Sequence, residues 1–265
     1  MIEYYGTLCQ SIFKVIKMIN IIAHRGANQV APQNTIPAFL AALDMNVNGF
    51  ENDVHLTSDG EVVVCHNDTI DATSNGKGKI SDYTLDELLK FDFGSSFSEK
   101  FKGTKIPKLN EFLDVSRDDR IEIMNIEIKS QKERNSSIVE KVIKQSKDLG
   151  VFEKLIISSF DEDVLLAAKE IEKNVKTALL FTPFHKITDQ IVADIRPVVK
   201  QFKLDALHPM LIMIDEKMME VAREIGIMVN AWTVNYQDAI EHMKNLSVHS
   251  IITDVPDFAS EILRK

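Results

Sequence analysis

The sequence has only two cysteines, no long apolar run and fewer basic than acidic residues. Cys9 and Cys65 make neither a disulfide framework nor a metal motif, so we expect a reducing compartment and a cytoplasmic protein. No apolar stretch is long enough to cross a bilayer. Lys and Arg number 31 against 40 Asp and Glu, and this formal net charge of −9 argues against nucleic acid as a partner. Any phosphate ligand must therefore be held locally, by a metal ion or a few cations.

The remaining composition is that of a globular protein with a large core. Of the 265 residues, 45% are hydrophobic and 27% are charged, which suits one α/β barrel. We expect residues 20–265 to form this domain and residues 1–19 to be an N-terminal lead-in without the features of a secretory signal. The lead-in could form a short amphipathic helix in weak contact with a membrane surface. We prefer the alternative that it packs on the base of the barrel.

Residues 21–26 have the pattern of a buried strand that ends in a histidine, an arginine and a glycine. In a parallel α/β sheet, such strand ends point their side chains at a ligand. His24 can transfer a proton near neutral pH, and Arg25 can hold a phosphate or carboxylate with two parallel donors. The alternative is a structural histidine beside a surface arginine. The residues that follow in the chain favour the functional interpretation.

The next strand, residues 50–54, carries two acidic residues. Glu51 and Asp53 are two positions apart, so their side chains share one face of the strand. Two carboxylates on one face repel unless a cation lies between them, and hard oxygen ligands select magnesium or calcium. A turn signal at 57–60 predicts a hairpin that would return His66 opposite Asp53 or Glu51.

Residues from about 67 to 108 interrupt the alternation of strands and helices and predict a small inserted subdomain that caps the site. The alternation resumes at 123–129, where Glu127 and Lys129 share one face and would complete a site for a metal ion and a phosphate. Nine segments have a strand pattern. If 61–65 is the return arm of the hairpin, eight remain for a closed (β/α)8 TIM barrel. The five later strand segments are 155–159, 175–181, 204–208, 227–234 and 250–253.

Ten short motifs are specific when their order and spacing are taken together. They are residues 24–26, 32–35, 51–54, 57–60, 66, 75–78, 125–129, 158–160, 232–235 and 252–254. In these motifs the chain resembles the glycerophosphodiester phosphodiesterase family, from about residue 21 to residue 262. The resemblance implies a (β/α)8 barrel that hydrolyses small-molecule glycerophosphodiesters to glycerol 3-phosphate and an alcohol.

The resemblance also implies one divalent cation, Mg²⁺ or Ca²⁺, and an acid/base pair of histidines. It does not decide which histidine is the acid, or whether water or a substrate hydroxyl is the nucleophile. The sequence is also silent on the oligomeric state. The implied site residues are His24 and His66 for catalysis, Glu51, Asp53 and Glu127 for the metal, Arg25 and Lys129 for the phosphate oxygens, and Trp232 for the glycerol side of the pocket.

The chain departs from the family pattern at three positions, which leaves its substrate preference open. Gln33 stands where glutamate is usual, Asn67 where aspartate is common and Ala72 where arginine is frequent. A lysophospholipase D-like or sphingomyelinase D-like barrel is the nearest rival, and the aromatic residues of the insertion could supply its apolar groove. A barrel that only binds phosphodiesters is less favoured, because a binding protein has no need of a proton-transfer pair. The role of His208 also stays open.

Overall fold

One sheet of nine strands organises the computed structural model, which describes residues 18–264. The strands are β1 (Asn20–His24), β2 (Gly49–Leu56), β3 (Val62–Val64), β4 (Ile123–Ile128), β5 (Leu155–Ser159), β6 (Lys176–Phe181), β7 (Ala206–Pro209), β8 (Met228–Ala231) and β9 (Ser250–Thr253). All except β3 pair in parallel, and β1 pairs with both β2 and β9, which closes an eight-stranded barrel. β3 pairs antiparallel with β2 as a hairpin. The predicted (β/α)8 barrel is therefore confirmed.

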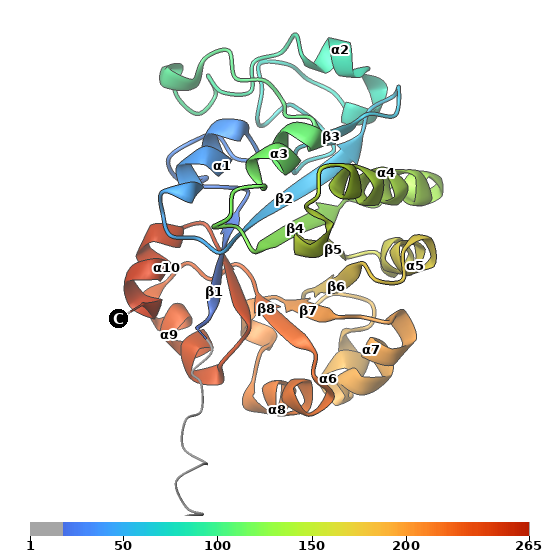
Figure 1. The fold of residues 1–265 in the computed structure, drawn as a ribbon, viewed down its shortest axis with the longest axis vertical. Helices are drawn as coiled ribbons and strands as arrows, with labels where there is room; N and C mark the ends of the chain where they lie inside the picture. Colours follow the sequence, from blue (N-terminus) through green and yellow to red (C-terminus); the bar gives the residue numbers. More distant parts are fainter. Residues whose placement is uncertain (1–17, 265) are drawn as a thin grey trace, which may run out of the picture.

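Helices surround this barrel (Figure 1). They are α1 (Ile36–Leu43), α3 (Leu109–Val115), α4 (Asn135–Asp148), α5 (Glu162–Ile171), α6 (Thr188–Ala193), α7 (Ile195–Phe202), α8 (Glu216–Ile225), α9 (Gln237–Leu246) and α10 (Pro256–Leu263), with short turns η3 (Lys132–Arg134), η4 (Phe152–Lys154) and η5 (Leu211–Met213). Most of the loops at the C-terminal ends of the strands are short. Polar side chains at the strand ends therefore meet at one face of the barrel.

Alternation along β2 separates the outer core from the site. The Phe50 ring faces the helices and lies 5.5 Å from Phe39 and 6.2 Å from Phe112, measured between ring centroids. Glu51 and Asp53 take the intervening positions and therefore point into the barrel. The burial of these aromatic rings on one face fixes the register that directs both carboxylates inward.

The inserted segment forms a small layer beside β3, at the top of Figure 1. It contains η1 (Ile80–Asp82), α2 (Leu85–Leu88) and η2 (Glu99–Phe101). Its apolar side chains pack on Val63 and Cys65 of the hairpin and form a cluster separate from the barrel core. This anchoring brings the loop around residues 72–97 next to the end of β1.

The N-terminal lead-in predicted for residues 1–19 lies outside the described residues except for its last two positions. The predicted contact of this segment with a membrane surface lies outside them as well. Between residues 18 and 264, the structure contains no helix with the length and apolar character needed to span a bilayer.

Asn52 is an exception in the outer core of β2. Its side chain is fully buried and neighbours Ile126 across the sheet. Within residues 18–264 neither its amide nitrogen nor its amide oxygen has a hydrogen-bond partner. An unpaired buried amide costs about 1–3 kcal/mol of stability. We expect Asn52→Leu to raise the free energy of unfolding by about that amount, measured by urea denaturation. A lower midpoint in the variant would contradict this expectation.

Candidate active site

The end of β1 turns sharply because two successive residues adopt left-handed backbone conformations. Arg25 has φ 58° and Gly26 has φ 77°. A Cβ atom at position 26 would lie 2.7 Å from the carbonyl carbon of Ala38 in α1, so only glycine fits this approach. The Arg25 amide donates to the side-chain Oε2 of Glu51 at 3.1 Å. The turn thereby places His24, the register partner of Glu51, at the rim of the barrel.

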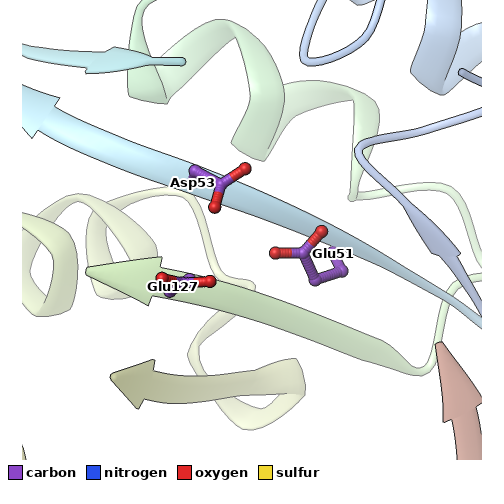
Figure 2. A group of neighbouring side chains, drawn as sticks. All are labelled: Glu51, Asp53 and Glu127. Carbon is purple, nitrogen blue, oxygen red and sulfur yellow. The ribbon is translucent and has the colours of Figure 1, made fainter. Parts of the chain in front are cut away.

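Three buried carboxylates lie on two adjacent strands, β2 and β4 (Figure 2). Glu51 and Asp53 come from β2, and Glu127 on β4 is the register partner of Asp53. Each contributes one oxygen such that the three oxygens lie within 4.8 Å of one another. The relative exposures are 3%, 1% and 8%. Their arrangement fits a divalent cation, because hard oxygen donors at this spacing can share one ion.

Two cationic side chains and one amide contact the same carboxylates. Lys129 Nζ lies 2.8 Å from Asp53 Oδ1 and also contacts the Glu127 carboxylate. Arg25 Nε lies 3.4 Å from Asp53 Oδ2, and Asn34 donates its amide to that oxygen at 2.8 Å. Asp53 is therefore the most heavily compensated of the three acids.

The pKa values of the three acids reflect this unequal compensation. Burial and repulsion from the two other carboxylates raise the pKa of Glu51 well above its ordinary value. Burial and repulsion from Asp53 raise the pKa of Glu127 to about 7. Burial also acts to raise the pKa of Asp53, but the charges of Lys129 and Arg25 outweigh it and lower that pKa. The positive charge around Glu51 and Glu127 therefore does not offset their burial and the repulsion between carboxylates, as expected of ligands for a cation.

His24 is oriented by a carboxylate from the far end of the chain. Its Nδ1 donates to Asp254 Oδ1 at 2.6 Å, because β9 neighbours β1 in the closed barrel. Asn28 donates to the same carboxylate, and Asn235 donates to its Oδ2 at 2.6 Å. Burial would raise the pKa of Asp254, but the hydrogen bond and charge of His24 bring it down to about 2. The Nε2 of His24 is left facing Glu51, 3.9 Å from its Oε2.

His66 reaches the site from the hairpin, but not in the predicted register. Cys65, rather than His66, lies opposite Asp53, and its amide donates to the Asp53 carbonyl at 2.9 Å. The prediction is wrong because Val54 pairs with Val64, a register that puts Cys65 opposite Asp53, and β3 ends at Val64, so His66 follows in the loop. The His66 Nδ1 donates to Asn67 Oδ1 at 2.7 Å. Burial lowers the pKa of the His66 imidazole.

A cavity of about 170 Å³ connects these groups. Trp232 closes one side, edge to face with Phe160 at 5.7 Å between centroids, and its Nε1 donates to the carbonyl of His208 at 2.6 Å. The His208 imidazole itself is fully buried, and burial lowers its pKa to about 3, so it does not act as a proton carrier near neutral pH. Asp53 does not line the cavity itself but contacts Lys129, which does. Lining the cavity are His24, Arg25, Glu51, His66, Glu127, Lys129 and Trp232 among others.

The structure thus brings together all the predicted site residues, and their individual roles stay predictions. Reasoning from the sequence gave no role to Asn34 or Asp254, although both belong to motifs that it noted. It also gave none to Asn235 and Phe160, which likewise belong to noted motifs, or to Asn28, which does not. A polar residue directly after an apolar strand segment was the available signal for Asp254.

Comparison with known proteins decides the family. The chain matches the glycerophosphoryl diester phosphodiesterase family over residues 24–258. The chain belongs to this family. The glycerophosphodiester phosphodiesterase of Caldanaerobacter subterraneus subsp. tengcongensis is 36% identical over 250 residues, which are 92% of this chain and 98% of that protein.

Solved structures of phosphodiesterases share the fold. The Agrobacterium tumefaciens enzyme is 26% identical with a TM-score of 0.78, and the match covers 92% of this chain and 100% of that one. A phosphodiesterase from Oleispira antarctica, solved with the product sn-glycerol-3-phosphate, has a TM-score of 0.82 at 22% identity and covers 94% and 98%. At that identity, the second comparison supports the fold alone.

Proposed function

We propose that this chain hydrolyses glycerophosphodiesters to glycerol 3-phosphate and an alcohol. The proposal rests on one observation above all. Two imidazoles, His24 and His66, border the same cavity as Glu51 and Glu127, two members of a cluster of three carboxylates. The similarity to relatives named for this activity supports the choice of substrate class. A cytoplasmic location is part of the proposal and rests on cysteine usage, since the buried Cys65 is a free thiol.

Glu51, Asp53 and Glu127 would hold one divalent cation, Mg²⁺ or Ca²⁺. The donor set fits such an ion, because all three ligands are oxygen atoms and two of the acids have raised pKa values. A bound cation supplies charge that stabilises the phosphate oxygens as negative charge develops. Lys129, which contacts Asp53 and Glu127, is positioned to bind a phosphate oxygen beside that ion.

The hydrogen bonds of the two imidazoles suggest different roles for them. Asp254 accepts from His24 Nδ1 and holds the ring with Nε2 facing the metal ligands, where this nitrogen can donate a proton to the departing oxygen. Asn67 offers His66 only a neutral amide oxygen, and burial lowers the pKa of the ring. We therefore assign His24 as the acid that protonates the departing oxygen and His66 as the base that activates the nucleophile.

The remaining predicted residues bind the substrate in this proposal. Arg25 lines the cavity beside His24 and would hold the phosphate oxygens. Trp232 and Phe160 present aromatic edges and faces that suit the carbon skeleton of glycerol. Phe97 is 43% exposed near the cavity mouth, and this exposed ring favours a lysophospholipid as the second candidate substrate.

A coupled assay for glycerol 3-phosphate tests the proposal. We expect the purified chain to release glycerol 3-phosphate from glycerophosphocholine or glycerophosphoglycerol, and a chelator to abolish the release until Mg²⁺ or Ca²⁺ is restored. Faster turnover of long-chain lysophospholipids would favour the second candidate. Binding of the diester without release of glycerol 3-phosphate would contradict the proposal and show that the barrel only binds phosphodiesters.

A further inference from the structure

A second cavity adjoins the candidate active site. This cleft, of about 370 Å³, lies between the loop that follows β1 and the inserted segment. It shares His24 and Arg25 with the smaller catalytic cavity. A phosphate held at these two side chains would therefore border both spaces. Each half of a phosphodiester then has a cavity of its own.

The contents of the two spaces indicate which half each one takes. The catalytic cavity of about 170 Å³ is closed by Phe160 and Trp232 and contains His66, which suits the small and constant glycerol half. The cleft is larger and contains no metal ligand and no His66. His24, the proposed acid, borders the cleft, so a leaving alcohol there would depart next to its proton donor.

The charges of the cleft are already paired. Besides His24, the described residues that line it carry only two charged groups, Arg25 and Asp254. Arg25 donates to Gln33 Oε1 at 2.7 Å, while Asp254 accepts from His24 and from two asparagines. An ammonium group in the cleft would thus meet no unpaired carboxylate. Phe93 belongs to the core cluster of the insertion and leaves Phe97 as a single exposed ring rather than an aromatic cage.

Neutral hydrogen-bonding groups remain for a ligand. Gln29 donates its amide to Asn28 Oδ1 at 2.9 Å, which leaves its own Oε1 able to accept. Among the described residues, the Thr73 hydroxyl has only a contact of 3.9 Å with Cys65 Sγ, and the Ser96 hydroxyl donates to the Thr73 carbonyl at 3.3 Å. Amide and hydroxyl groups of this kind match the alternating donors and acceptors of a polyol.

We propose that the cleft binds the leaving alcohol and selects an uncharged polyol over an alcohol that carries an ammonium group. Gln29, Thr73 and Ser96 are the specificity-determining side chains. The inference rests on the proposed hydrolysis of glycerophosphodiesters and names the substrate class of that site. It predicts a larger kcat/KM for glycerophosphoglycerol than for glycerophosphocholine or glycerophosphoethanolamine.

The test compares kcat/KM for glycerophosphoglycerol and glycerophosphocholine in the wild type and in variants of the cleft. Thr73→Val and Ser96→Ala each remove one hydroxyl and should lower the ratio of the two values about 2–10-fold, the effect of one neutral hydrogen bond. Gln29→Glu adds a carboxylate that can pair with the choline ammonium. It should lower the ratio further, because it raises kcat/KM for glycerophosphocholine. Ser81→Ala is the matched control, because Ser81 is exposed on the same insertion outside the cleft.

Product inhibition separates the two halves of the substrate. The inhibition constant of sn-glycerol 3-phosphate should be the same in Thr73→Val and wild type but should rise in Trp232→Ala. A rise in Thr73→Val would place the glycerol half in the cleft and overturn the inference. A preference for choline, or a ratio that no cleft variant changes, would overturn it while the hydrolysis stands. No glycerol 3-phosphate from any diester would overturn the proposed function and this inference together.

Discussion

Replacing either His24 or His66 with alanine should lower kcat by about 10²–10⁴-fold, the usual contribution of one positioned proton-transfer group. His24 lies at the rim of the barrel and His66 in a loop, and both are only partly buried. The loss of either ring should therefore leave the barrel folded, which circular dichroism and the urea midpoint would check. His242→Ala on the exposed surface of α9 is the matched control. Near-normal turnover in either active-site variant would remove that histidine from the mechanism.

Asp254 provides a second measurement of the same mechanism. Asp254→Asn keeps the size of the side chain but loses the carboxylate that accepts from His24 Nδ1 and orients the ring. If Asp254 acts through His24, its substitution should lower kcat in the wild type and have little further effect in His24→Ala. Independent, multiplying losses in the double variant would show that Asp254 has another role. In the His66→Ala background, by contrast, Asp254→Asn should lower kcat by about the same factor as it does in the wild type.

The repeating strand-helix pattern made most of the barrel predictable. Apolar runs identified all nine strands, and the turn at 57–60 identified the hairpin that does not belong to the barrel. The sequence pattern near 186–196 indicates a single helix, but the structure has two helices there, α6 and α7. Asp194 begins α7 by accepting from the Arg196 amide at 3.0 Å, and Pro197 is tolerated because it lies in the first turn. A proline near the start of a helix is easily misread as its end.

The site was predictable where it depends on local periodicity. The shared face of Glu51 and Asp53 follows from the two-residue repeat of a strand. The contact between His24 and Asp254 does not, because 230 positions separate them in sequence and only barrel closure makes β1 and β9 neighbours. The contact of Asn34 with Asp53 could not be predicted from local periodicity either. Asn34 adopts a left-handed conformation with φ 57°, which directs its amide to Asp53.

The second large effect concerns the cation and can be measured without turnover. In the metal-free protein, Glu51 and Glu127 have pKa values raised above those of the unfolded chain. Acids with raised pKa values stabilise the fold at low pH, and that contribution is lost as pH rises through the folded-state pKa, which is about 7 for Glu127. Metal-free protein should therefore melt at a lower temperature at pH 8 than at pH 5.

A bound cation reverses this loss, so the gain in Tm on adding Mg²⁺ or Ca²⁺ should be large at pH 8 and small at pH 5. At 100 times its Kd, an ion that binds only the folded state adds about 2.7 kcal/mol, or roughly 5–10 °C for a domain of this size. Glu51→Gln keeps an oxygen that can accept from the Arg25 amide but removes one buried charge. It should raise the Tm of the metal-free protein at pH 8 and abolish most of the gain from the metal. The repulsion among these carboxylates is what links metal binding to pH in this way. Equal gains in Tm at both pH values, or an undiminished gain in Glu51→Gln, would therefore mean that the carboxylates do not share the ion.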